Sequence, residues 1–464
     1  MRNTIIHLFE THGHYYLYDV NVNDIVEINN KAYCDLMDNN YENNKDIKKL
    51  IEQGFLMQRR EFIMQHPLDK QLEGLLKRNL KSMTLQVTKN CNLRCKYCVY
   101  SGTYTNRTHK NERMSETIAY KSIDFFLEHA IDSEYLNLGF YGGEPILEFD
   151  LIKKCIEYME NNKGDKTVTY SMTTNATLLT KEMIEFLNKY SVELTISLDG
   201  PKDIHNLNRI SADEKVGSFN KVINSIQLVE KECPEYSKFI NFNAVMTPEY
   251  GFEIYNKFFC EDDLIKHYVS VVNLPSNNYA KNKYTLNEEF IEEFNYELFK
   301  YYFSTIRNDA DIKVSKLLKM HYQRLHDDIH EGLKISTDNL KIEHPSGPCV
   351  VGRHRLFVET GGDFYPCERV SECSEIMKIG NIYRGFDLTN IRNMLNIGKI
   401  TEEKCRNCWA FRFCTICAVK ADGGDKLSAE MKASHCEEIK RSVDDRMKDY
   451  CMFKEMGYDF EKEN

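Results

Sequence analysis

Short apolar runs alternate with amphipathic stretches through the middle of the chain. Six runs have the apolar, β-rich composition of buried strands, and the five segments between them place apolar residues at helical spacing. The predicted strands are 84–87, 136–140, 168–172, 194–197, 239–245 and 269–272, and the predicted helices lie near 115–131, 148–161, 180–189, 217–232 and 252–266. Repeated βα units form a parallel sheet, which can curl into a full or partial barrel. We therefore predict an α/β core, a partial (β/α)6 TIM barrel.

The regions on either side of this core have different patterns. Before it, three short β-like stretches near 5–9, 15–18 and 25–28 precede two helix-like segments near 30–38 and 44–53. This order favours a winged-helix-like module, and a plain N-terminal extension that caps the core is the alternative. After the core, a charged, tyrosine-rich helical connector leads to an irregular, cysteine-dense region. The expected domains are 1–82, 83–285, 286–345 and 346–451.

Charge and hydropathy exclude two classes of partner. The chain has 61 Lys and Arg against 71 Asp and Glu, a formal net charge of −10, which argues against a nucleic-acid-binding protein. No stretch approaches the roughly 18 uninterrupted apolar residues of a membrane span, and the start lacks a secretory apolar segment. We expect a soluble cytoplasmic protein that binds neither nucleic acid nor a membrane.

The sixteen cysteines change this picture most. Three lie close together after the first predicted strand, and eight lie between Cys349 and Cys436. In a reducing cytoplasm, clustered thiols indicate metal or redox chemistry rather than structural disulfides. The other five are expected to be free thiols: Cys34, Cys155, Cys233, Cys260 and Cys451.

The loop Cys91-x3-Cys95-x2-Cys98 is the strongest chemical signal. Three thiolates on one short loop can hold three irons of a [4Fe–4S] cube and leave the fourth iron without a protein ligand. Zinc is the alternative, although a closed zinc site needs a fourth ligand. Polar loops at 142–145 and 173–177 follow the next two strands. Because parallel strands end at one edge of a sheet, these loops are expected to share a site with the thiols.

These motifs resemble the radical S-adenosylmethionine (SAM) enzymes. The resemblance rests on the Cys loop with Tyr97 before its last cysteine, and on the Gly142-Gly143-Glu144-Pro145 motif after the second strand. It implies a cluster whose open iron binds SAM and cleaves it to a 5′-deoxyadenosyl radical. The SAM contacts that it implies are Tyr97, Gly142, Gly143, Glu144, Pro145, Asn175, Ser197 and Arg209. Ordinary turn contacts for Asn175 and Ser197, and a surface ion pair for Arg209, are the alternatives.

The C-terminal cysteines resemble a SPASM domain, which implies two auxiliary [4Fe–4S] clusters and three clusters in all. By this resemblance, Cys405, Cys408, Cys414 and Cys436 hold the distal cluster, and Cys349, Cys367 and Cys417 hold the proximal one. The fourth proximal ligand is either Cys373 or a substrate thiolate. A zinc ribbon fits poorly, because only five residues separate Cys408 from Cys414.

The resulting hypothesis is a maturase that forms a sulfur-to-carbon thioether in a Cys-rich ribosomal peptide of the sactipeptide or ranthipeptide type. The alternatives are an anaerobic sulfatase-maturing enzyme and a non-catalytic iron–sulfur electron-transfer protein. Glu368, directly after Cys367, is either a catalytic base or an Arg-paired carboxylate. The expected partners are a precursor peptide, whose leader adds a strand to the N-terminal module as in RiPP recognition elements, and a low-potential electron donor such as flavodoxin or ferredoxin.

Overall fold

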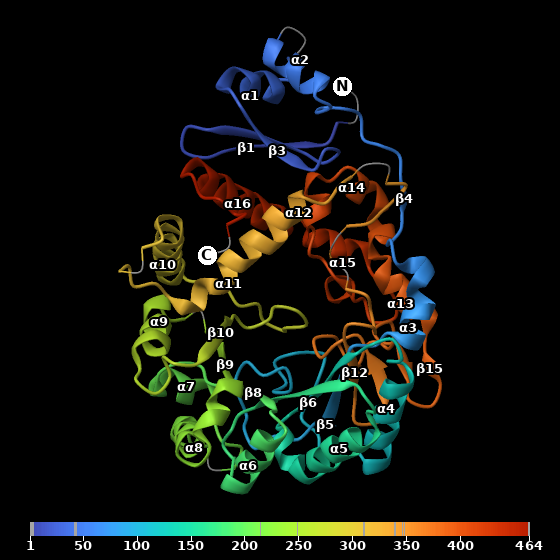
Figure 1. The fold of residues 1–464 in the computed structure, drawn as a ribbon, viewed down its shortest axis with the longest axis vertical. Helices are drawn as coiled ribbons and strands as arrows, with labels where there is room; N and C mark the ends of the chain where they lie inside the picture. Colours follow the sequence, from blue (N-terminus) through green and yellow to red (C-terminus); the bar gives the residue numbers. More distant parts are fainter. Residues whose placement is uncertain are drawn as a thin grey trace.

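A ten-stranded sheet of order β10-β9-β8-β7-β6-β5-β12-β13-β14-β15 forms the base of the molecule (Figure 1). The computed structural model describes residues 4–40, 44–213, 215–247, 249–309, 311–337, 340–345, 347 and 349–462. The strands are β5 (Ser82–Thr88), β6 (Tyr135–Gly142), β7 (Thr167–Thr174), β8 (Glu193–Ser197), β9 (Ile240–Val245), β10 (Val269–Asn273), β12 (Leu356–Val358), β13 (Asp363–Tyr365), β14 (Gly380–Asn381) and β15 (Gly385–Phe386). Each neighbouring pair from β5 to β10 is parallel, which confirms the predicted α/β core.

Helices connect these strands and cover the outer side of the sheet (Figure 1). They are α4 (Glu116–Glu128), α5 (Phe149–Asn162), α6 (Lys181–Lys189), α7 (Lys202–Asn208), α8 (Phe219–Glu232) and α9 (Phe252–Glu261). Side-chain caps start two of them: Ser115 accepts the backbone N–H of Ile118, and Thr180 accepts that of Met183. Helix α7 was not predicted, because its seven residues are too short to show a helical period.

The cysteine-dense region extends this sheet. Strand β12 pairs in parallel with β5, with Leu356 opposite Met83, and β13 to β15 add antiparallel pairs. Sequence analysis described this region as irregular, since strands of two or three residues carry no readable alternation. The pairing places the segment between Cys349 and Cys367 beside the strand that leads into the Cys91 loop.

The N-terminal region contains the predicted strands and helices. Strands β1 (Ile6–Glu10), β2 (Tyr15–Asp19) and β3 (Asp24–Ile28) form an antiparallel sheet in that order. One face buries Leu17 against α1 (Asn30–Met37) and α2 (Lys45–Glu52), and the other buries Tyr18 against α16 (Cys436–Glu455) (Figure 1). The C-terminal helix therefore completes the core of the N-terminal sheet.

The remaining elements join the two ends of the chain. They are α3 (Leu72–Arg78), α10 (Glu288–Arg307), α11 (Lys319–Arg324), the π-turn η5 (Leu325–His330), α12 (Glu331–Leu333), α13 (Leu388–Leu395), α14 (Glu402–Arg406), α15 (Ala429–Ser434), and the paired strands β4 (Ile63–Met64) and β11 (Ile342–Glu343). Asn23 in the β2–β3 turn donates from Nδ2 to the carbonyl oxygens of Gly332 (2.9 Å) and Ile335 (3.1 Å), which ties the N-terminal sheet to the connector. Within the described ranges, no helix has the length and apolar character needed to cross a membrane.

Candidate functional site

The three thiols of the first loop lie in one buried cluster after β5. Cys91 and Cys98 pack against the cluster of Leu93, Cys95 and Tyr97. Burial raises the pKa of the Cys95 thiol to about 12, and burial also raises the pKa of Cys91, which the neighbouring Cys95 and Cys98 raise further. A metal that binds such thiols displaces their protons into solvent. The structure brings the three thiols into one buried group, and metal binding there stays a prediction.

A buried aspartate and a buried arginine contact this loop and hold it in place. Asp199, fully buried after β8, accepts hydrogen bonds from the Tyr97 hydroxyl, from Nε of Arg209 (3.0 Å) and from the backbone N–H of Val245 (3.1 Å). Arg209 Nη1 in turn lies 3.9 Å from Cys95 Sγ, and its guanidinium lies 5.5 Å from the centre of the Tyr97 ring. Arg209 is thus engaged in a buried ion pair, not the surface ion pair that the sequence left open, and its contact with SAM stays a prediction. Sequence analysis did not single out Asp199 as a site residue, although the Asp-Gly-Pro turn at a strand end was the available signal.

Two glycines at the end of β6 let the backbone there lie directly against the backbone of the Cys91 loop. A Cβ at Gly142, where φ is +152°, would lie 2.1 Å from Thr88 O, and a Cβ at Gly143 would lie 2.1 Å from Asn90 O. Because no side chain occupies this space, the two backbones hydrogen-bond: Gly143 N donates to Thr88 O and Glu144 N donates to Asn90 O, each at 2.9 Å. The loop after β6 therefore fastens the start of the Cys91 loop through its backbone, which only glycine permits at this distance.

The Glu144 carboxylate organises the next loop. It is 1% exposed and accepts hydrogen bonds from Thr174 Oγ1 (2.6 Å), Asn175 N (2.7 Å) and Ile146 N (3.1 Å). Burial raises the pKa of this carboxyl, and these three donors oppose the shift by stabilising the charged form. Glu144 thereby fixes the loop after β7 relative to the loop after β6, just before Pro145.

Two further candidates lie at the same edge of the sheet. Asn175 donates from Nδ2 to Asn92 Oδ1 at 2.8 Å, and the same nitrogen lies 3.9 Å from Cys91 Sγ. Ser197 is the last residue of β8 and is 9% exposed. The structure thus brings together residues from the ends of four consecutive strands, β5 to β8, as the sequence predicted from the edge rule.

A second thiol group forms in the C-terminal region. The pKa of Cys367 is raised to about 11, mainly by burial, and the charges of Glu368, Cys349 and Cys417 contribute to this shift. Cys349 and Cys417 are therefore near enough to Cys367 to interact with it electrostatically. Cys373 instead places its Sγ 3.6 Å from the carbonyl oxygen of Asn106.

Glu368, next to Cys367 in the chain, is paired with an arginine. One of its carboxylate oxygens lies 3.1 Å from Arg355 Nη1, and the side chain is 24% exposed. This is the geometry of the ion-pair alternative. A catalytic role for Glu368 stays a prediction.

A third thiol group contains the remaining four cysteines of the set. The pKa of Cys408 is raised by burial and by the neighbouring Cys405 and Cys436, and Lys440 opposes the shift. The pKa of Cys414 is raised to about 11 by burial, with Cys405 and Cys408 adding to it and Lys432 opposing it. The assignment of these four cysteines to one cluster, and of Cys349, Cys367 and Cys417 to another, stays a prediction from the resemblance.

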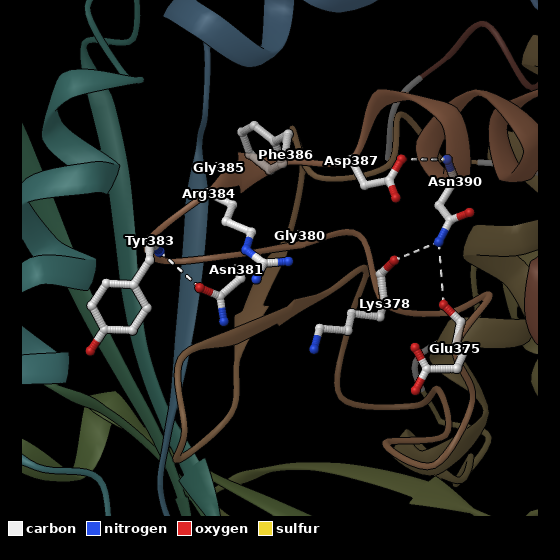
Figure 2. A pocket seen from close by; sticks show the side chains of 10 residues that line it. All are labelled: Glu375, Lys378, Gly380, Asn381, Tyr383, Arg384, Gly385, Phe386, Asp387 and Asn390. Atoms are coloured by element: carbon white, nitrogen blue, oxygen red, sulfur yellow. Dashed lines mark hydrogen bonds between the residues drawn. The ribbon is translucent and has the colours of Figure 1, made fainter.

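Two other features of the molecule have the outward form of a site. A hollow of about 530 Å³ lies beside the β14–β15 turn, and none of its lining residues is a cysteine. Figure 2 shows that Asn390 fills part of it by bonding the backbone carbonyls of Lys378 and Glu375. It therefore lies outside the thiol chemistry.

The second feature is a group on the connector. His326, His330 and Glu331 place their ligand atoms within 4.8 Å of one another. Lys334 Nζ lies 2.8 Å from Glu331 Oε1 and 2.9 Å from Glu461 Oε1, so an ammonium already neutralises the carboxylates there. The group is an ion network rather than a built metal site.

Comparison with known proteins shows which proteins this chain is similar to. Residues 85–252 match the family model of the Radical SAM superfamily. A cysteine-type anaerobic sulfatase-maturating enzyme from Clostridium novyi (strain NT) is 26% identical over 349 residues, 72% of this chain and 87% of that protein. The radical SAM cyclopropyl synthase TigE from Paramaledivibacter caminithermalis is 26% identical over 234 residues, 47% of each chain.

Solved structures share the fold. The structure of native anSMEcpe with bound AdoMet has a TM-score of 0.59 at 23% identity and covers 79% of this chain and 97% of that one. A structure of the same enzyme with AdoMet and a peptide has a TM-score of 0.58. This chain therefore contains a radical SAM domain, the fold that binds SAM and a [4Fe–4S] cluster. Over 72% of its length the chain is similar to a cysteine-type anaerobic sulfatase-maturating enzyme.

The residues present fit this cofactor. The first loop offers thiols only, which are the ligands of iron–sulfur clusters. The Arg209 guanidinium beside Cys95 supplies positive charge next to a thiolate. The two glycines let the backbone after β6 lie directly against the loop, where any side chain would intrude.

Proposed function

We propose that this enzyme forms an intramolecular thioether between a cysteine sulfur and a carbon atom of a Cys-rich precursor peptide. The observation that carries the proposal is the grouping of Cys349, Cys367 and Cys417 without Cys373, whose described contact is with Asn106. A cluster held by these three thiolates would keep one iron for a substrate thiolate, a ligand that iron–sulfur centres bind well.

In this proposal Cys91, Cys95 and Cys98 hold the cluster that binds SAM. When bound, the two groups together supply the 5′-deoxyadenosyl radical that abstracts a substrate hydrogen. The chain's own part is positional: Asp199 and Arg209 hold the loop, and Glu144 orients the backbone of Asn175. We assign Asn175 and Ser197 to SAM contacts because they line the same edge as the thiols.

The domains follow the same proposal. Residues 1–82 are assigned to leader recognition, 83–285 to the radical SAM core, 286–345 to the connector and 346–451 to a SPASM domain. Cys405, Cys408, Cys414 and Cys436 are the proposed ligands of its distal cluster. A low-potential donor such as flavodoxin or ferredoxin is the proposed source of electrons.

The metal content tests this cluster assignment. Protein reconstituted without oxygen is expected to hold about twelve irons per chain, because three cubes carry four irons each. Replacing Cys405 and Cys408 by alanine is expected to lower the count to about eight, whereas Cys34→Ala, an exposed thiol outside the three groups, leaves it unchanged. Iron and zinc are measured together by plasma emission. A wild-type count near four, or zinc at the distal cysteines, contradicts the assignment.

The N-terminal sheet supports the proposed peptide partner. Strand β1 is an edge strand, and its ladder contacts at Ile5 and Thr11 point toward β2. In an antiparallel pair the bonding direction alternates, so Ile6, Leu8 and Glu10 turn their backbone groups outward. A groove of about 390 Å³ beside this edge contains Ile6, Leu8, Leu36, Met37 and Leu56 among its lining residues. An extended leader could add a strand there and place alternate side chains in the groove.

Substituting proline at this edge tests leader binding. Leu8→Pro removes an outward N–H and is expected to reduce peptide modification at least tenfold, while SAM cleavage without peptide stays within twofold of wild type. Leu8→Ala is the control, because it shortens the same side chain and keeps the N–H. Equal losses in the two variants would assign the effect to packing. Deleting residues 1–80 is less informative, since Leu72, Leu76 and Leu80 are part of the main core.

Formylglycine formation is the second candidate, favoured by the similarity to the cysteine-type sulfatase-maturating enzyme of Clostridium novyi. Anaerobic incubation with SAM and a reductant separates the two. With a Cys-rich peptide encoded beside this chain's gene, the proposal expects loss of two hydrogens and one thiol protected from alkylation. A sulfatase-derived cysteine peptide converted to an aldehyde, with the Cys-rich peptide unchanged, would establish the second candidate instead.

A further inference from the structure

Lys432 is a buried ammonium on α15 that the mechanism above does not use. Its residue is 2% exposed, although lysine is almost never fully buried without a partner. Its Nζ donates to Thr401 Oγ1 at 2.5 Å and to Cys405 Sγ at 3.4 Å. The Thr401 hydroxyl itself lies 3.2 Å from Cys405 Sγ. Lysine, threonine and cysteine thus form one contact group at the third set of thiols.

No carboxylate compensates this charge in the part of the chain that the structure describes. Every ion pair within 4.0 Å there involves other residues, and Lys432 is in none of them. A buried charge is costly unless it is paired and hydrogen-bonded. A neutral hydroxyl and a neutral thiol are weak compensation. The geometry around Lys432 is therefore that of a cation built for an anion centred on the cysteines.

A second lysine, Lys440, lies on α16 one helical turn after Cys436. Lys440 pairs with Glu437 at 2.9 Å, whereas Lys432 has no such acidic partner among the described residues. Of these two lysines, Lys432 is the one whose ammonium contacts a cysteine sulfur and, among the described residues, no carboxylate.

We propose that Lys432 sets the reduction potential of the distal cluster by compensating its negative charge, and so makes that cluster the acceptor of the electron released during thioether formation. This inference rests on the proposed function, because thioether formation is the step that releases that electron. Four thiolates give the cluster a net negative charge, which grows on reduction. Net charge and hydrogen bonds to the sulfurs are two of the factors that set such potentials. A nearby fixed cation stabilises the reduced form more, and the potential rises.

The electron balance agrees with this role. Cleavage of SAM consumes one electron and gives methionine and the 5′-deoxyadenosyl radical, which becomes 5′-deoxyadenosine by taking a hydrogen atom from a substrate carbon. The substrate thiol loses a proton. Its sulfur then bonds to the carbon radical, and one electron leaves. The overall reaction releases a proton and returns the electron that was spent, so an acceptor held at a higher potential than the SAM-binding cluster removes that electron.

An anaerobic redox titration followed by electron paramagnetic resonance tests the role of Lys432. The full chain carries Cys91→Ala, Cys95→Ala and Cys98→Ala, so only auxiliary clusters contribute. In this background Lys432→Met keeps the length and removes the charge, and one cluster signal is expected to titrate at a more negative potential. The expected change is at least tenfold in the ratio of reduced to oxidised cluster, ~59 mV for a one-electron couple. Lys432→Arg should restore the wild-type value, and Lys399→Gln, at an exposed lysine nearby, should not change it.

The other possible outcomes also support or overturn the role of Lys432. If Lys432→Met loses about four irons and Lys432→Arg keeps them, the charge is needed to hold the cluster, which supports the compensation. Iron loss in both variants, or an unchanged potential in Lys432→Met, overturns the inference. The peptide assay is separate: a Lys432-dependent potential without any crosslinked product refutes only the proposed function, and a crosslinked product with a Lys432-independent potential refutes only the role of Lys432.

Discussion

Replacing Cys95 by alanine is expected to abolish the formation of 5′-deoxyadenosine from SAM, a loss of at least a thousandfold. Cys95 is one of three thiols on a single loop, so its removal leaves two protein ligands for a cube that needs three. It also removes the sulfur that faces the Arg209 guanidinium. Chromatographic detection of 5′-deoxyadenosine after anaerobic incubation with dithionite measures the effect.

Cys155→Ala is the matched control for this variant. Cys155 is a fully buried thiol of the same domain, on α5, and belongs to none of the three cysteine groups. We expect it to keep SAM cleavage within threefold of wild type. The iron count should fall by about four in Cys95→Ala and stay constant in Cys155→Ala. Continued 5′-deoxyadenosine production by Cys95→Ala would remove this loop from the mechanism.

Replacing Asp199 by asparagine is expected to lower the free energy of unfolding by about 3–5 kcal/mol, because it leaves the buried Arg209 without its counter-ion. The same change weakens the hydrogen bond from Tyr97, so the loop that holds the thiols loosens. We expect iron bound at this loop to fall together with stability. Urea denaturation followed by circular dichroism, with iron analysis of the same samples, measures both.

An exposed ion pair provides the comparison. Arg78 and Asp132 form two hydrogen bonds of 2.7 and 2.8 Å, but both side chains are about half exposed. Asp132→Asn is expected to change stability by less than about 1 kcal/mol, as surface ion pairs do. The double variant Asp199→Asn, Arg209→Gln removes both charges and should recover part of the loss. A stability loss no larger than that of Asp132→Asn would show that Asp199 does not support Arg209.

Much of the fold was readable from local pattern. The core strands are five to eight residues long and largely apolar, so they appear as apolar runs, and the predicted N-terminal strands around Tyr16 and Val26 were found at the same positions. The short strands β12 to β15 were not predicted, since strands of two or three residues show no alternation, and β12 also pairs with a distant strand, with Leu356 opposite Met83. The Asp-Gly-Pro turn gave Asp199 a place at a strand end, but its role follows only from its contacts with Tyr97 and Arg209.

The sequence by itself determined that this chain holds clustered thiols on a βα core, because cysteine spacing and strand periodicity are local properties. The tertiary structure decided which distant groups meet: that Asp199 pairs with Arg209 behind the Cys91 loop, that α16 completes the core of the N-terminal sheet, and that Lys432 is buried against Cys405. Burial and charge pairing depend on the packing of segments far apart in the chain, and no local pattern encodes them.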